Sequence, residues 1–324
     1  MKRSVALVRS LNTRNDDHGK GTYQMTHGRN EMPGVAYPHL GAVCAKTLEL
    51  PGNPLPGHIH APGGGRGNNA AYLGPKYASI GVSGNPPENS SRPDSISDTA
   101  DQLRESVRRQ ANDQFTKRRR TAETDVYTYS FEQARELMKQ RDVFDVAKEP
   151  EKDHERYGKY DFGRHCLLAR RLLEHGVTFV QVSHSNYDTH NENFNFHLEQ
   201  LGEFDRSFAA LVNDLDSRGM LSSTLVVVMS EFGRTPNINQ YYGRDHWGAA
   251  WSICLGGARI QPGAVIGKTN PNGTAVADRE VDHGHLFHTY LSAVGMNPMD
   301  SFQVAGRSLP MADPTRTAIR ELLT

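Results

Sequence analysis

The hydrophobic positions predict alternating helices and strands in the second half of the chain. Residues 162–175 place apolar side chains on one helical face, and residues 177–182 follow as a nearly continuous apolar run. A further helix is predicted over 194–218, where Gly219 ends it, and the apolar run 225–229 comes next. Because nearly continuous apolar strands are typical of parallel sheets covered by helices, we expect an α/β sheet with 177–182 as a central parallel strand.

The first half of the chain is more polar and predicts fewer buried elements. Residues 4–9 form a short candidate strand, and a helix is expected over about 22–27, before Gly28. Residues 51–97 are rich in proline and glycine, which indicates a surface excursion of loops. Residues 98–120 are charged and permit a helix.

A second helix of this polar region is predicted over 129–139, and a further strand at 252–255. We therefore expect a single domain over residues 1–324, with a loop-rich and helical polar excursion at about 51–150.

The charge balance and the apolar runs exclude several classes of protein. The 324 residues contain 37 lysines and arginines and 37 aspartates and glutamates, so the net charge is zero. A nucleic-acid-binding protein would usually show a basic excess, and we expect no such partner. No apolar run approaches the roughly 20 residues of a membrane helix, so we expect no transmembrane segment. The first nine residues lack the apolar core of a signal peptide.

Histidine is the residue type that indicates chemistry. Three cysteines are too few and too scattered for a disulfide framework or a thiolate zinc site. The chain contains 15 histidines, several of them beside acidic residues. Imidazole and carboxylate ligands together suit divalent cations, so the histidines direct the search toward a metal site.

Polar motifs follow the two most apolar runs. Asp188 and His190 come after run 177–182, in a spacing that puts both side chains on one side of an extended loop. Glu231 directly follows run 225–229, and Asp245-His246 comes shortly afterwards. Because ligands collect at the carboxyl ends of strands in α/β sheets, we expect these five residues to bind metal. Asp188 or Asp245 could instead orient a histidine rather than bind directly.

Four further positions are candidate site residues. Arg234 and Arg244 flank the same loops and could hold an anionic group, although ordinary solvation of loop arginines is the alternative. The turn before the predicted N-terminal helix contains His18, a candidate nucleophile, and glycines that would let an anion approach the helix end. Thr22, in the same turn, is a candidate helix cap.

Several motifs of the chain match one known family. They include residues 7–10, 17–19, 72–75, 157–158, 162–163, 168–172, 174–177 and 179–182, with Tyr187-Asp188-Thr189-His190, Ser230-Glu231-Phe232-Gly233-Arg234-Thr235-Pro236 and Gly243-Arg244-Asp245-His246-Trp247. With these motifs the chain resembles the sulfatase-like family known as domain of unknown function 1501, of the alkaline-phosphatase superfamily. The resemblance covers most of the chain and is weakest over 81–125 and at the C-terminal tail.

The resemblance implies a fold and a site. The fold would be a three-layer alkaline-phosphatase-like sandwich with a mainly parallel central sheet. Asp188, His190, Glu231 and Asp245-His246 would be metal ligands, and the turn with His18 and Thr22 would occupy the nucleophile position. Relatives begin with a strand ending in a Gly-Gly-x-Ser-x-x-Asp motif, which nothing before Ser4 matches. We therefore expect an N-terminally truncated version, without that strand, its ligand or an export signal.

The leading functional hypothesis is a metal-dependent hydrolase that acts on small-molecule or glycan esters of sulfate or phosphate. Its cofactor would be one or more divalent ions, such as zinc, calcium, manganese or magnesium. Two alternatives stay open: a non-catalytic, metal-containing binding protein of the cell envelope, and an inactive truncated fragment. The resemblance suggests a periplasmic or cell-envelope setting for the full-length protein. The sequence leaves the oligomeric state open.

Overall fold

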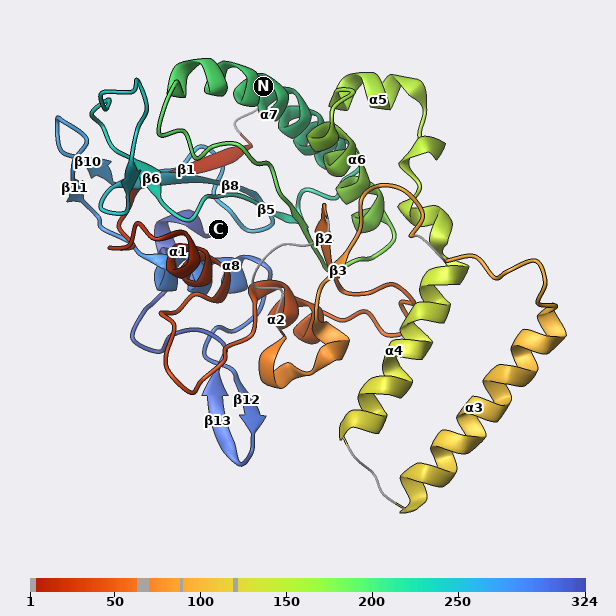
Figure 1. Cartoon of the computed structure of the whole chain (residues 1–324). Coiled ribbons are helices and arrows are strands. Elements are labelled where there is room, and N and C mark those ends of the chain that lie inside the picture. Colours follow the sequence, from red (N-terminus) through yellow and green to blue (C-terminus); the bar gives the residue numbers. More distant parts are fainter. Residues whose placement is uncertain (1–3, 63–69, 88–89, 119–121) are drawn as a thin grey trace.

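The computed structural model describes residues 4–62, 70–87, 90–118 and 122–324. One of its sheets has four strands and is mixed (Figure 1). Its strands, in spatial order, are β5 (Leu225–Val228), β8 (Trp251–Gly257), β1 (Val5–Leu11) and β9 (Val265–Ile266). Strand β8 runs antiparallel to both of its neighbours, whereas β9 is parallel to β1. The expected α/β architecture is confirmed, but the expectation of a mainly parallel central sheet is wrong for this sheet. No helix separates β5 from β8, so the chain returns in the opposite direction.

A second sheet contains three parallel strands, in the order β3 (Ile80–Gly81), β2 (His58–Ala61) and β4 (Phe179–Val182). Strand β2 is completely buried although it lies within residues 51–97, where the composition predicted only surface loops. Strand β4, expected at the centre of a sheet, lies at an edge among the described residues, and its four residues are half-buried. The apolar run therefore predicted the strand correctly but not its place.

Helices cover the sheets on two sides (Figure 1). On one side, α5 (Glu151–Tyr157), α6 (Asp161–Glu174) and α7 (Asn193–Ser217) contact one another, and α6 packs against β4. On the other side lie α1 (His18–His27), α2 (Leu40–Thr47) and α8 (His283–Ala293), where α1 contacts α8 and α2 contacts β2 and β4. None of the helices in the described parts of the chain is long and apolar enough to cross a membrane.

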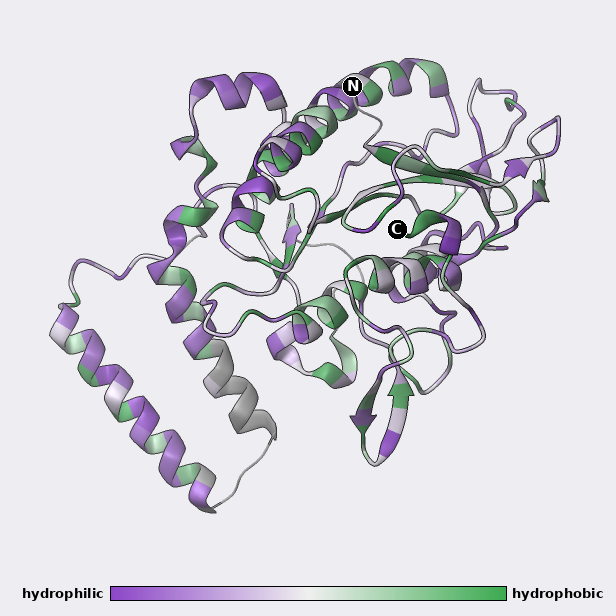
Figure 2. Ribbon diagram, turned by 180° about the vertical axis from the view of Figure 1, so that it is seen from behind, coloured by the Kyte–Doolittle hydropathy of each residue, from purple (hydrophilic) through white to green (hydrophobic). Residues whose placement is uncertain are grey.

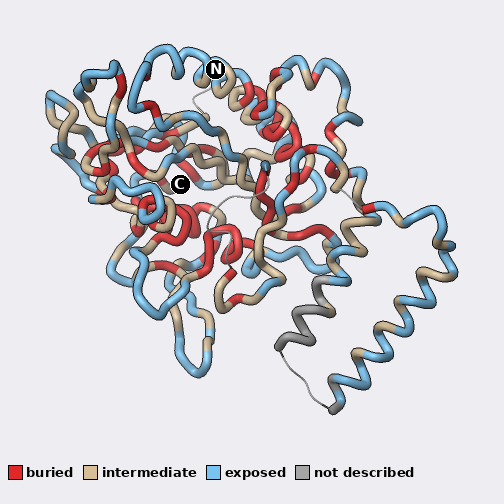
Figure 3. Tube along the Cα trace, viewed as in Figure 1, coloured by how far each residue is buried: buried red, intermediate tan, exposed pale blue. Residues whose placement is uncertain are grey.

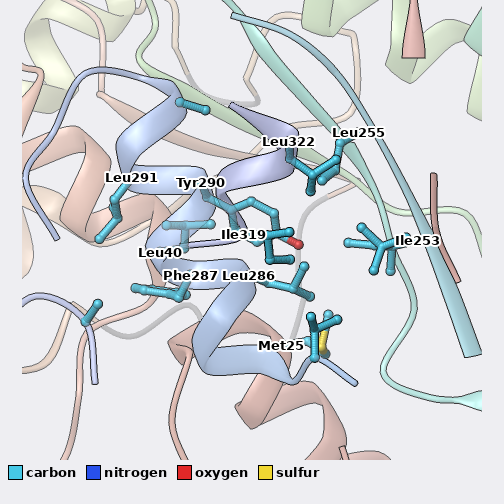
Figure 4. Close-up of a cluster of buried hydrophobic side chains, with 14 of the residues drawn as sticks. Met25, Leu40, Ile253, Leu255, Leu286, Phe287, Tyr290, Leu291, Ile319 and Leu322 are labelled. Carbon is cyan, nitrogen blue, oxygen red and sulfur yellow. The ribbon is translucent and has the colours of Figure 1, made fainter. Parts of the chain in front are cut away.

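Two hydrophobic clusters fill the spaces between sheets and helices. The first joins β1 and β8 to α8 and α1, with Leu255, Phe287 and Tyr290 almost fully buried (Figure 4). The second lies between β2 and α6, around Ile59 and Leu168. The first cluster also contacts Phe179 of β4, so it reaches both sheets.

The polar region contains a pair of helices, the second of which packs Leu137 against the second hydrophobic cluster. Helix α3 (Asp98–Arg118) contacts α4 (Ala122–Lys139), and its described residues are exposed or half-buried (Figures 1 and 3). The remaining elements are the strand pairs β6 (Gly233–Arg234) with β7 (His246–Trp247), β10 (Lys268–Thr269) with β11 (Val276–Asp278) and β12 (Ser301–Val304) with β13 (Arg307–Pro310), and short 3-10 helices at Ala71–Leu73, Pro75–Tyr77, Arg141–Phe144, Val146–Lys148 and Arg320–Leu322.

Candidate metal centre

Asp188 lies at the centre of a cluster of histidines and arginine. Its Oδ1 atom lies 2.9 Å from His246 Nε2 and 3.1 Å from His190 Nε2, and Arg234 Nη2 donates to it at 2.6 Å. Its other oxygen, Oδ2, lies 3.1 Å from His18 Nε2. The side chains of His18, Asp188 and His190 are each about half exposed, so the cluster is open to a ligand from solvent.

Four segments of the fold bring these side chains together. Asp188 and His190 lie on the loop between β4 and α7. Arg234 ends β6 and His246 begins β7, and the two residues are directly paired in that antiparallel ladder. His18 is the first residue of α1, and Asp17 fixes this helix end because its side chain accepts from the Lys20 N–H at 2.9 Å.

The tautomer of His246 is fixed by the hydrogen bond of its Nδ1 atom, the ring nitrogen that faces away from Asp188. His246 Nδ1 lies 2.7 Å from the carbonyl oxygen of Asp16, which can only accept a hydrogen bond. The Nδ1 atom therefore carries a proton, and in the neutral ring the Nε2 atom turns a lone pair toward Asp188.

His190 is held in the same way. Its Nδ1 atom lies 2.8 Å from Asp245 Oδ1, which also accepts from Asn239 at 3.1 Å. The hydrogen bond from His190, followed by that from Asn239, lowers the pKa of Asp245. An ionised carboxylate accepts the Nδ1 proton, so His190 Nε2 also presents a lone pair in the neutral ring.

Three lone pairs thus converge on one point. The distances among His190 Nε2, His246 Nε2 and Asp188 Oδ1 are 3.1, 3.1 and 2.9 Å. A proton on one ring can bridge only one of these three contacts, whereas a cation between them satisfies all three. A metal bound at about 2.1 Å to ligands at right angles holds them about 3.0 Å apart, which fits this triangle. Two histidines and one carboxylate are a common ligand set for divalent transition metals.

His18 extends the cluster on the other side of Asp188. Its Nδ1 atom lies 2.7 Å from Glu231 Oε1, so both ring nitrogens face carboxylates. Burial works to lower the pKa of His18, but Glu231 and Asp188 outweigh it and raise this pKa. Burial likewise opposes ionisation of Asp188, yet Arg234 and His246 hold its pKa well below the usual range. One ligand atom each from His18, Asp188 and His246 lies within 4.8 Å of the other two.

The other residues proposed from the sequence lie farther from this point. Glu231 and Asp245 contact imidazoles of the cluster, which is the orienting role left open for Asp245. Arg244 Nη1 donates to the carbonyls of Thr235 and Pro236, so its anion-binding role stays a prediction. Thr22 is half-buried one turn along α1 from His18, and among the described contacts its side chain makes no hydrogen bond to the cluster.

Three residues support the cluster without having been predicted. Asp16 acts through a carbonyl, and Asn239 bridges Asp245 and the His190 carbonyl, at 3.1 and 2.9 Å. Phe232 is buried, and the centre of its ring lies 4.3 Å from the ring centre of His246 and 5.0 Å from that of His18. Phe232 sits beside Glu231 at the end of an apolar run and within a motif that matches the family, and these were the sequence signals for it.

Comparison with known proteins places the chain in a family. None of the curated proteins and none of the solved structures that were compared matches it. The model of one protein family matches residues 1–323. The chain therefore belongs to the family described as protein of unknown function DUF1501.

Proposed function

We propose that this protein is a metal-dependent hydrolase of sulfate or phosphate monoesters, with a fold related to the alkaline-phosphatase superfamily. The observation that supports this best is the triangle of lone pairs from Asp188, His190 and His246, with edges of 2.9 to 3.1 Å. These three residues would hold a divalent cation, such as zinc, manganese, magnesium or calcium. When bound, such a cation polarises an ester oxygen and neutralises charge that develops as the ester bond breaks.

Arg234 would hold the anionic ester group. Its Nη2 atom contacts Asp188 and its Nη1 atom donates to the Arg244 carbonyl at 3.2 Å, which fixes the guanidinium beside the cluster. A guanidinium carries five N–H groups, so donors remain for a non-bridging oxygen. The side chain of Arg234 is only 19% exposed, so its guanidinium is held in place beside the cluster.

His18 would move a proton. It is fixed between the carboxylates of Glu231 and Asp188, which raise the pKa of its ring and so favour the protonated form. His18 could donate this proton to the departing alkoxide. The alternative role for His18, as a further metal ligand with Asp188 and His246, is compatible with the 4.8 Å grouping of their ligand atoms.

The experiment is metal analysis combined with turnover. We expect the purified, dialysed protein to retain about one or two equivalents of a transition metal, and Asp188→Asn and His246→Ala to lose it. His175→Ala, at the exposed end of α6, is the matched control and should retain the metal. Hydrolysis of a panel of sulfate and phosphate monoesters should follow the metal content. A folded wild type without metal, or turnover that survives His246→Ala, would refute the proposal.

A non-catalytic, metal-containing binding protein is the second candidate. It is favoured by one observation: the Thr22 hydroxyl, proposed as a nucleophile, makes no hydrogen bond to the cluster among the described contacts. This candidate requires metal binding that is lost in Asp188→Asn, together with no turnover of any ester in the panel. An inactive fragment would show neither metal nor turnover.

A further inference from the structure

An exposed apolar surface lies next to the candidate metal centre. Phe194, Leu198 and Leu201 follow a spacing of four and then three residues, so they share one face of α7. We call this face, together with three side chains of the loop between β6 and β7, the apolar rim; the loop contributes Ile238, Tyr241 and Tyr242. Its six side chains are between 48% and 78% exposed. Figures 2 and 3 show the N-terminal end of α7 with hydrophobic residues and a largely exposed chain.

Backbone contacts tie the apolar rim to the cluster. The N–H groups of Glu192 and Asn193 donate to the carbonyls of Tyr241 and Tyr242, at 3.1 and 3.0 Å. On the other side of the same loop, Asn239 donates to the carbonyl of His190 at 2.9 Å. Both where the β4–α7 loop enters α7 and in the β6–β7 loop, the residues of the rim and those of the metal cluster are therefore only a few positions apart.

Further contacts hold the two parts together. The guanidinium of Arg244 lies 5.9 Å from the centre of the Phe194 ring, while the backbone N–H of Arg244 donates to Thr189 at 3.0 Å. A Cβ at Gly243 would lie 1.9 Å from the His190 carbonyl carbon, so loop and metal-site segment are in close contact. Phe194 and the loop part of the apolar rim therefore lie beside the cluster, and Leu198 and Leu201 follow Phe194 along the same face of α7.

The size and chemistry of the rim favour a small apolar ligand. Six partly exposed side chains offer a few hundred Å², the size of the largest patch on many monomers and often functional. A stable interface between two copies buries about 800 Å² on each partner. The rim offers only the two tyrosine hydroxyls for hydrogen bonds, whereas a sugar requires several.

We propose that the apolar rim binds the hydrocarbon part of an amphiphilic monoester, an alkyl sulfate or alkyl phosphate, whose anionic head lies at the metal cluster. This inference rests on the proposed function, and it specifies the substrate class. The cationic groups at the cluster, Arg234 among them, recognise the head, while Leu198 and Leu201 remove the chain from water. Such a substrate would match both halves of the surface.

The test compares methyl, butyl and octyl esters, below the micelle concentration of the octyl compounds. A methylene that is buried on one side should raise kcat/KM about twofold. The octyl ester has seven more methylenes than the methyl ester, so its kcat/KM should be higher on the order of 100-fold. In the double variant Leu198→Ser/Leu201→Ser this ratio should fall below about 10-fold. Leu103→Ser is the matched control, because Leu103 is exposed on the distant helix α3, and it should keep the full ratio.

A binding measurement separates failure of this inference from failure of the proposed function. Calorimetry with octyl and butyl sulfate should show tighter binding of the octyl compound by the wild type, and this difference should be lost in the double variant. If no ester is hydrolysed but this result holds, the proposed function fails and the apolar rim stands. If chain length affects neither turnover nor binding, the inference is overturned. It is also overturned if sedimentation shows a dimer that the double variant converts to monomer.

Discussion

Lowering the pH from about 8 to about 5 should destabilise the protein through a buried group of histidines. His27 ends α1, His39 precedes α2 and His58 begins β2, and all three are at most 3% exposed. The rings of His39 and His58 stack at 5.0 Å, and His27 meets His39 edge-on at 5.7 Å. His58 Nδ1 faces the Tyr77 carbonyl, and among the described residues its Nε2 atom has no hydrogen-bond partner, so the structure provides no acceptor for a proton added there. His39 Nδ1 accepts from the Gly41 N–H, so a proton added to that ring would face a donor.

The magnitude follows from the pKa values. Burial lowers the pKa of both His27 and His58 from 6.5 to about 4, and it lowers that of His39 well below the usual value. Between pH 6.5 and 4 the unfolded chain therefore binds protons that the folded chain does not, and stability is lost as the pH falls through this window. At about pH 5 each of His27 and His58 should reduce the free energy of unfolding by about 2 kcal/mol.

Burial also lowers the pKa of His60, His165 and His283, so these groups add to the loss in acid. Two groups of the metal cluster titrate differently. Glu231 and Asp188 raise the pKa of His18 although burial opposes them, so its contribution is present at low pH and is lost as the pH rises. The pKa of Asp188 itself is lowered, so the stability that its ionised form contributes is lost only in stronger acid. Substitution of one buried histidine is therefore needed to separate its contribution from those of the other groups.

The assay is urea unfolding at both pH values for the wild type and His58→Phe. Phenylalanine keeps a ring beside His39 and Phe179 but cannot take up a proton, so the loss between the two pH values should be about 2 kcal/mol smaller than in the wild type. His175→Ala, an exposed histidine, should show the wild-type loss. An identical pH dependence in His58→Phe and the wild type would refute the reasoning.

Two further predictions concern packing and charge. Arg170 is 2% exposed and contacts Glu149 and Glu174, which keep Arg171 and Arg218 as partners. Arg170→Ala should remove the buried cation of this network and destabilise the fold by about 2–3 kcal/mol in urea unfolding; a loss below about 1 kcal/mol would contradict this. Gly243→Ala would place a methyl group 1.9 Å from the His190 carbonyl carbon and displace the loop, so we expect metal retention to fall; full retention in a folded variant would show that the loop adapts.

The sequence by itself determined the elements whose patterns are local. The apolar stripe over 162–175 predicted a helix that the structure places at Asp161–Glu174, and the run 225–229 corresponds to β5. These predictions succeed because helical and strand periodicity records which side chains of one segment are buried. The motif that contains Asp188 and His190 was equally local, since both residues lie on one loop after an apolar run.

The tertiary structure decided strand direction, neighbours and the assembly of the cluster. An apolar run carries no sign of direction, so the antiparallel β8 and the edge position of β4 were not predictable from composition. Strand β2 was missed because its four residues, which include two histidines, lie among proline-rich and glycine-rich loops. Asp188 meets partners that are distant in sequence, among them His18, 170 positions away, and His246, 58 positions away. Such contacts arise from the packing of whole elements against one another, and no local pattern in the chain encodes the distance between them.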